Sequence, residues 1–327
     1  MIKIYFKDVG QGDSIVLEWE KDGSQKIGII DCHINNGTNP TLDHLKRLNP
    51  IEIEFIILTH FHYDHFSGMA DIFDHCIKSN IKIKYFYHSI AAFVLEIYNR
   101  VLTTQKVSKA IKEFFDKYEG VDDNITNDKI QISKHIQNIE LNNTTSLKFL
   151  APAGRVYEKM DKQIARKIAR VKNTYSDVNK LACIMLIENA KQNVLLTSDA
   201  VKSNYKKLKL TTESVLVQAP HHGSWQNIIE PFWKGINKIN DCPCVFSVGD
   251  EPKDKLPNEE TVRMFDTFQF KIYSTNPTYG IDSFFKLNNP ISPAGNKGSI
   301  INIFSKPRKN ARVNSSQYSG EQIFSVL

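Results

Sequence analysis

Short apolar or alternating runs, separated by glycine or aspartate, occupy much of residues 2–58. Such runs are typical of strands, because side chains alternate between the faces of a sheet and turns favour Gly and Asp. A second set of these runs lies in the later part of the chain. The predicted strands are residues 2–6, 14–18, 26–30, 55–58, 181–187, 194–197, 214–218 and 244–248.

Apolar residues at helical spacing lie between and within these two sets of strands. Residues 41–48, 68–79 and 90–118 carry this pattern, which predicts amphipathic helices. Residues 155–172 are a further helical candidate. Two strand-rich halves with helices outside each of them predict an α/β protein.

Composition changes this picture little. The chain has 327 residues, of which 41% are hydrophobic and 24% charged, typical of a soluble protein with a sizeable core. No apolar run approaches about 18 residues, and the N-terminus lacks the apolar core of a signal peptide, so we expect no membrane association. Five cysteines, an odd number, favour free thiols in a reducing compartment, and we expect a cytoplasmic location.

A run of possible metal ligands follows directly after the predicted strand that ends at Leu58. His60 and His62 would point the same way from an extended segment, and Asp64 and His65 follow in the turn. Imidazole and carboxylate together suit zinc, manganese or iron, and two such pairs suggest two adjacent metals. A solvated histidine-rich turn is the alternative, but the position after a buried strand favours metal binding.

Four motifs, in order along the chain, resemble those of a known superfamily. HxHxDH at residues 60–65 resembles the signature of the metallo-β-lactamase superfamily. DVGQGDS at residues 8–14 and PHHGS at residues 220–224 resemble the nuclease domain of the competence protein ComEC. LLTSD at residues 195–199 resembles the LLTGD of that subgroup, with Ser198 where glycine is usual.

This resemblance runs from residue 2 to about residue 285, nearly the whole chain. It implies a four-layer αββα sandwich, the metallo-β-lactamase fold, over residues 1–287. We expect residues of about 90–120 to form a helical insertion that decorates this domain. Residues 288–327 are expected to be an accessory segment or tail.

The resemblance also implies a role for each candidate ligand. The first metal would take the two histidines of HxH, the second would take the following Asp-His pair, and a later aspartate would bridge both metals. One histidine of the PHHGS pair would complete the second metal. The residues at these positions are His60, His62, Asp64, His65, Asp199, and either His221 or His222.

Three further residues are expected to support the site from outside the ligand shell. Asp31, at the end of a predicted strand, and Asp13, in a glycine-flanked turn, match supporting positions of the family. Asn179 stands where many members have a third histidine for the first metal, and the ComEC-like subgroup usually has asparagine there. The cofactors would be two divalent ions, Zn²⁺ or Mn²⁺, with Mg²⁺ as a further candidate.

Catalysis implied by the resemblance is attack of a metal-bound hydroxide on phosphorus. Asp64 would accept a hydrogen bond from this nucleophile, and whichever of His221 and His222 is not a ligand could donate a proton to the leaving group. Ser224 could contact a phosphate oxygen or cap the following helix, and both roles stay open. The subgroup's His-Pro motif is matched by Leu256-Pro257, without the histidine.

The charge pattern bears on the substrate. Net charge is +6, and basic residues concentrate at 155–172, 202–209 and 296–327. These stretches could attract the phosphate backbone of nucleic acid or could merely keep the protein soluble. Together with the motifs they favour a nuclease that acts on DNA.

Two alternatives come from other classes. The first is a hydrolase of small phosphoesters, such as a phosphorylcholine esterase, which would have a small pocket lined by aromatic rings. The second is an effector component that is silent until a protein partner docks on the helical insertion or the tail. The sequence says nothing about the oligomeric state.

Overall fold

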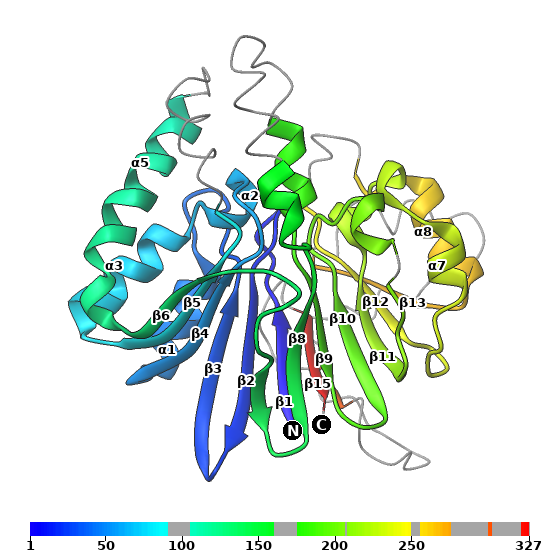
Figure 1. Ribbon diagram of the computed structural model, residues 1–327, viewed down its shortest axis with the longest axis horizontal. Helices are drawn as coiled ribbons and strands as arrows, with labels where there is room; N and C mark the ends of the chain where they lie inside the picture. The colour runs from blue at the N-terminus through cyan, green and yellow to red at the C-terminus, as the bar shows by residue number, and fades with distance from the viewer. Residues whose placement is uncertain are drawn as a thin grey trace.

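The computed structural model of the chain contains two β-sheets that pack face to face, with helices on both outer faces (Figure 1). It describes residues 1–90, 105–159, 175–206, 208–249, 256–275, 300–302 and 322–326. This is the αββα arrangement of the metallo-β-lactamase fold, and the predicted fold class is confirmed.

The first sheet has eight strands among the described residues, in the order β14-β15-β1-β2-β3-β4-β5-β6. Their bounds are β1 (Ile2–Phe6), β2 (Ile15–Lys21), β3 (Ser24–Ile30), β4 (Glu52–Leu58), β5 (Lys82–His88), β6 (Ile125–Gln131), β14 (Ile300–Asn302) and β15 (Gln322–Val326). From β3 to β6 neighbouring strands are parallel.

The second sheet has seven strands within the described ranges, in the order β13-β12-β11-β10-β9-β8-β7. Their bounds are β7 (Ile139–Asn142), β8 (Thr145–Ala151), β9 (Ile184–Glu188), β10 (Gln192–Leu196), β11 (Glu213–Gln218), β12 (Pro243–Phe246) and β13 (Lys271–Ser274). From β10 to β13 neighbouring strands are parallel.

The helices flank the sheets on their outer faces or lie in the connections between strands. The α-helices are α1 (Pro40–Leu48), α2 (Tyr63–Phe66), α3 (Met69–Ser79), α5 (Gln105–Gly120), α7 (Glu230–Lys234) and α8 (Glu259–Thr267). The 3₁₀ helices are η1 (Asp122–Asn124), η3 (Tyr175–Leu181), η4 (Lys202–Tyr205), η5 (Pro220–Gly223) and η6 (Trp225–Asn227). Figure 1 shows α1, α3 and α5 over the first sheet, and α7 and α8 over the second.

Alternation along β4 shows how the layers form. Phe55 and Ile57 belong to the apolar core between the two sheets, whereas Ile56 and Leu58 belong to the core under the helices of the first sheet. All four side chains are fully buried. A strand buried on both faces therefore appears in the sequence as a continuous apolar run.

Most predicted elements of the core are present, with shifted ends. The strand predicted at residues 181–187 begins only at Ile184, because η3 occupies Tyr175–Leu181. Of the predicted helix at 90–118, α5 is described and residues 91–104 lie outside the described residues. Of the helix predicted at 155–172, residues 160–172 likewise lie outside them.

The described part of the segment after residue 288 contributes to the first sheet. β15 pairs antiparallel with β1, and Phe324 on β15 is fully buried in the core between the sheets. β14 adds a further parallel strand beside β15. The domain boundary at 288 stays a prediction, but this pairing attaches residues 322–326 to the domain.

Two other expectations can be compared with the structure. All five cysteines are buried free thiols, as predicted. Within the described ranges, no helix combines the length and the apolar character needed to cross a bilayer.

Candidate metal centre

The candidate ligands lie where strands of both sheets end. The segment His60–His65 follows β4 of the first sheet and enters α2, whose first turn holds Asp64. Asp199 follows β10, and His221 and His222 follow β11, both in the second sheet. Carboxyl ends of parallel strands meet at one edge of a sheet, so residues far apart in sequence converge there.

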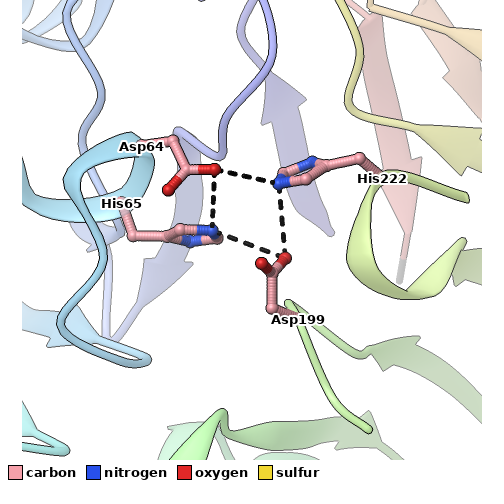
Figure 2. A group of neighbouring side chains, drawn as sticks. All are labelled: Asp64, His65, Asp199 and His222. Atoms are coloured by element: carbon pink, nitrogen blue, oxygen red, sulfur yellow. Dashed lines mark ion pairs between the residues drawn. The ribbon is translucent and has the colours of Figure 1, made fainter. Parts of the chain in front are cut away.

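Asp64, His65, Asp199 and His222 form a first group of possible ligand atoms, and Figure 2 shows their side chains pointing toward one another. Oδ1 of Asp199 lies 3.4 Å from Nε2 of His65 and 3.3 Å from Nε2 of His222. Nε2 of His222 lies 3.4 Å from Oδ2 of Asp64. Tetrahedral ligands bound at about 2.1 Å from a metal are about 3.4 Å apart, so this group has the spacing of a coordination shell.

Hydrogen bonding in this group fits a cation. Nε2 of His65, Oδ1 of Asp199 and Nε2 of His222 are buried and have no hydrogen-bond partner. Leaving three such atoms unsatisfied would cost several kcal/mol, at about 1–3 kcal/mol each. A divalent ion among them would satisfy all three, so the donor set fits the implied metal.

The second group consists of His60, His62 and Asp199. Nε2 of His60 lies 3.1 Å from Nδ1 of His62 and 3.6 Å from Oδ2 of Asp199. Asp199 therefore faces the first group with Oδ1 and the second with Oδ2. This is the geometry expected of a carboxylate that bridges two ions.

The structure distinguishes the two adjacent histidines. His222 belongs to the group around Asp64, whereas His221 belongs to neither group within the described residues. Nε2 of His221 lies 3.6 Å from Oδ2 of Asp199, and its Nδ1 lies 2.9 Å from the amide nitrogen of Asn227. The geometry thus favours His222 as the ligand and leaves His221 on the wall of the site.

Hydrogen bonds behind the ligands orient their rings. Nδ1 of His222 donates to the carbonyl oxygen of Ser247 at 2.8 Å, and Nδ1 of His65 donates to Oδ2 of Asp31 at 2.7 Å. Because these partners only accept, each ring carries its proton on Nδ1 and can present the Nε2 lone pair to the cluster. Asp31 is held in turn by Thr59, whose backbone N–H donates to Oδ1 at 2.8 Å.

Electrostatics in the metal-free protein couples the acids to the histidines. Burial alone would raise the pKa of Asp199, but the neighbouring His221, His222 and His65 hold it well below its usual range. Burial would lower the pKa of His222, but Asp199 and Asp64 raise it to about 9. Burial raises the pKa of Asp31 to about 6, against the opposing effect of His65. Fixed negative charge at Asp64 and Asp199 is what a divalent ion requires.

The backbone around the site is strained. Asp31, Ser198, His221 and His222 have φ values of 55°, 44°, 48° and 52°, in the left-handed region. This conformation costs about 1–2 kcal/mol for a residue other than glycine, and such strain often accumulates at functional sites. Glycine, which the ComEC-like motif has at the position of Ser198, adopts this conformation without strain. The serine retains a compensating contact, because its Oγ lies 2.7 Å from Oγ1 of Thr59.

The remaining predicted residues lie close to the cluster. Asp13 is buried, and its Oδ2 lies 3.9 Å from Nδ1 of His65. Asn179 lines the site, and its Nδ2 lies 3.4 Å from Nδ1 of His221. Ser224 also lines the site, and its Oγ accepts from Nδ2 of Asn227 at 3.3 Å.

A cleft of about 650 Å³ opens over the cluster. Most of its lining outside the candidate ligands is polar and uncharged, with many side-chain amides. Lys106, at the start of α5, also lines it, and Leu256 lines it where the subgroup's histidine would stand. The amides that line the cleft are Gln11, Asn35, Asn36, Asn179, Gln226, Asn227 and Asn258.

Sequence reasoning missed several residues of the site. Asn227 and Lys106 lie in segments without a motif, and Thr59 is a single threonine between a predicted strand and the histidine run. Gln218 offered a weak signal, since it is a polar residue at the end of the apolar run of β11. Its contacts with the opposite sheet could not be read from local pattern.

One family model matches part of the chain, and several solved structures resemble it. The family model described as the metallo-beta-lactamase superfamily matches residues 8–131. A search of curated proteins finds no match. Similar solved structures include the metallo-beta-lactamase fold protein YhfI from Bacillus subtilis, at 12% identity over 87% of this chain and 90% of that one, with a TM-score of 0.41.

Two further structures resemble the chain at a similar level. Zn(2+)-bound PqqB from Methylobacterium extorquens is 8% identical over 84% of this chain and 98% of that one, with a TM-score of 0.43. A diphosphatase from the PhnP family is 10% identical over 84% and 86%, with a TM-score of 0.38. The two-sheet architecture of the chain is that of the metallo-beta-lactamase fold, and the family model matches the part of the chain that contains the segment 60–65.

Proposed function

We propose that the protein is a metal-dependent hydrolase of phosphodiester bonds, and that its substrate is DNA. The observation that carries this proposal is that Asp199 presents one carboxylate oxygen to each of two ligand groups. Two divalent ions held there would activate water for attack and neutralise charge on a phosphate. The ComEC-like motifs point to the same chemistry.

Residues of the chain would perform the remaining tasks. Asp64 is 30% exposed and lines the cleft, so it can accept a hydrogen bond that orients the attacking water. The amide nitrogen of Asn227 donates to Nδ1 of His221, which leaves the ring proton on Nε2. His221 would donate that proton to the leaving oxygen. Ser224 would hydrogen-bond a phosphate oxygen.

The lining of the cleft favours a polyanionic substrate over a choline ester. Recognition of a quaternary ammonium group requires several aromatic faces. Among the described lining residues, Tyr63 is the one phenylalanine, tyrosine or tryptophan, and the ammonium of Lys106 lies 5.0 Å from its ring centroid. A cation already occupies that position. The amides and the lysine suit phosphates and base edges instead.

The donor set bears on the choice of metal. The group around His60 and His62 has two imidazoles and a shared carboxylate, with Asn179 in place of a third histidine. More oxygen and fewer nitrogen ligands favour Mn²⁺ or Mg²⁺, whereas the group with His65 and His222 also suits Zn²⁺. We therefore propose Mn²⁺ or Zn²⁺ as the activating ion, with Mg²⁺ as a further candidate.

Cleavage of labelled plasmid and single-stranded DNA by metal-stripped protein tests the proposal. The protein would be titrated with Mn²⁺, Mg²⁺ and Zn²⁺, beside Asp64→Ala, Asp199→Ala and the exposed control Asp116→Ala on α5. Cutting should require added metal, persist in the control and disappear in the other two variants. Hydrolysis of a small phosphodiester without cutting of DNA would favour the phosphoesterase. Metal binding without any hydrolysis would favour activation by a partner.

A further inference from the structure

Gln218, the last residue of β11, has a buried amide that joins three segments. Its Nε2 donates to Oδ2 of Asp13 at 2.9 Å. Its Oε1 accepts from the backbone N–H groups of Thr197 and Ser198, each at 3.0 Å. The side chain is 2% exposed, so water does not compete for these bonds.

These bonds connect the two halves of the candidate metal site. Thr197 and Ser198 lead directly into Asp199, the shared ligand of both groups. Asp13 belongs to the other half, because its backbone N–H donates to the carbonyl oxygen of Asp64 at 3.0 Å. Gln218 therefore links the loop that carries Asp199 to the turn that carries Asp64.

The loop before Asp199 has a particular need for such support. Ser198 is held in the left-handed region, where a serine backbone is unfavourable. Asp199 must also aim its two oxygens at two different groups, and metal sites require placement within about 0.5 Å. A pair of fixed N–H groups immediately before Asp199 constrains its direction.

We propose that Gln218 is a positioning residue that aligns Asp199 with the ligands of the opposite sheet. The inference rests on the proposed metal site and adds to it a residue that touches neither metal nor substrate. Loss of a supporting partner behind a ligand typically weakens metal binding by about 10- to 100-fold. Gln218→Ala is expected to weaken binding of Mn²⁺ and Zn²⁺ to this extent.

Asn193 provides a matched control. Asn193 lies near the start of β10, and its buried side-chain amide joins β10 to the residues around the start of β11. Gln218 joins the same two strands at their carboxyl ends. Its Nδ2 donates to the carbonyl oxygen and Oγ1 of Thr212, both at 2.8 Å, and its Oδ1 accepts from Oγ of Ser214 at 2.9 Å. Asn193→Ala thus removes as many hydrogen bonds without touching the site.

The experiment compares wild type, Gln218→Ala and Asn193→Ala by calorimetric titration of metal-stripped protein with MnCl₂ or ZnCl₂, and by thermal unfolding without metal. Both variants should unfold at similarly reduced temperatures, and Gln218→Ala alone should bind metal more weakly. Gln218→Met, which keeps the length of the side chain, should show the same loss and serves if the alanine variant does not fold.

Equal metal affinity of Gln218→Met, Asn193→Ala and wild type would overturn the positioning role. That result would leave the proposed function intact, since wild type would still bind metal. Failure of wild type to bind either ion would overturn the metal site itself, and the positioning role with it. The two failures are therefore distinguishable.

Discussion

Two clusters of buried histidines and acids in this protein differ in how their polar atoms are satisfied. In the metal centre, Nε2 of His65 and of His222 and Oδ1 of Asp199 converge without hydrogen-bond partners. In the second cluster, Lys7 Nζ donates to Nδ1 of His44 at 2.6 Å, and Nε2 of His44 donates to Glu18 at 2.6 Å.

We call the second cluster the Lys7 network; it consists of Tyr5, Lys7, Glu18, His44 and Arg47. It joins β1 and β2 to α1, and its side chains bond one another. A cluster that satisfies itself stabilises the fold, whereas one whose donor atoms converge unsatisfied is prepared for a ligand. Burial and residue type alone do not separate the two.

The substitution with the largest expected effect disrupts the metal centre and leaves the Lys7 network unchanged. Asp199→Ala removes the ligand that both groups share, so binding of both ions and DNA cleavage should fall by more than about 100-fold, the upper end for a merely supporting residue. Calorimetric metal titration and nuclease assays measure this. His44→Leu is the control, and a comparable loss of metal affinity there would contradict the distinction.

The stability of the fold should depend on the Lys7 network, whose disruption should leave metal binding unchanged. His44→Leu leaves Glu18 and Lys7 without the imidazole that hydrogen-bonds both of them, and a buried polar group left unsatisfied costs about 1–3 kcal/mol. The free energy of unfolding, measured in urea, should fall by this amount with no change in metal affinity. His75→Leu, on α3 and outside both clusters, should have a small effect, and an equal loss there would refute the role of the network.

The pH dependence of stability isolates Lys7. Burial lowers the pKa of Lys7 to about 7, well below its ordinary value of about 10.4. Between these values the unfolded chain binds the proton and the folded chain does not, so this group makes stability rise with pH, by at most about 1.4 kcal/mol per unit. Below pH 7 both states bind the proton and the contribution is constant.

Lys7→Met should remove this pH-dependent contribution to the free energy of unfolding. Urea unfolding of wild type and variant at pH 7, 8 and 9 gives the slope of the free energy of unfolding against pH for each protein. The difference between the two slopes isolates Lys7, because groups that titrate in both proteins contribute equally to both slopes. If the free energies of unfolding of wild type and Lys7→Met changed in parallel with pH, Lys7 would be protonated in the folded protein throughout this range.

The smallest expected effect concerns the strained loop of the metal centre. Ser198→Gly relieves about 1–2 kcal/mol of left-handed strain but loses the contact with Thr59, worth about 1 kcal/mol. Thermal unfolding should therefore show little net change. Ser198→Ala keeps the strain and loses the contact, so it should be the less stable of the two. The reverse order would mean that the strain at this position is negligible.

Much of the fold could be predicted because its elements carry local signals. β1 matches its predicted range, and α1 and α3 match within one residue. β5 escaped prediction, since lysines interrupt its apolar positions, and β15 lies in a polar tail. The pairing of β15 with β1 depends on contacts across nearly the whole chain, which no local window contains.

The candidate site could likewise be predicted only in part. The spacing of His60, His62, Asp64 and His65 was enough to indicate a metal site, because ligands so close in sequence after a strand must be close in space. Only the folded chain decided that His222 rather than His221 joins this group. It also decided that Gln218 connects the two halves. Those relations depend on the packing of two sheets and on the direction of single side chains, and periodicity along the chain encodes neither.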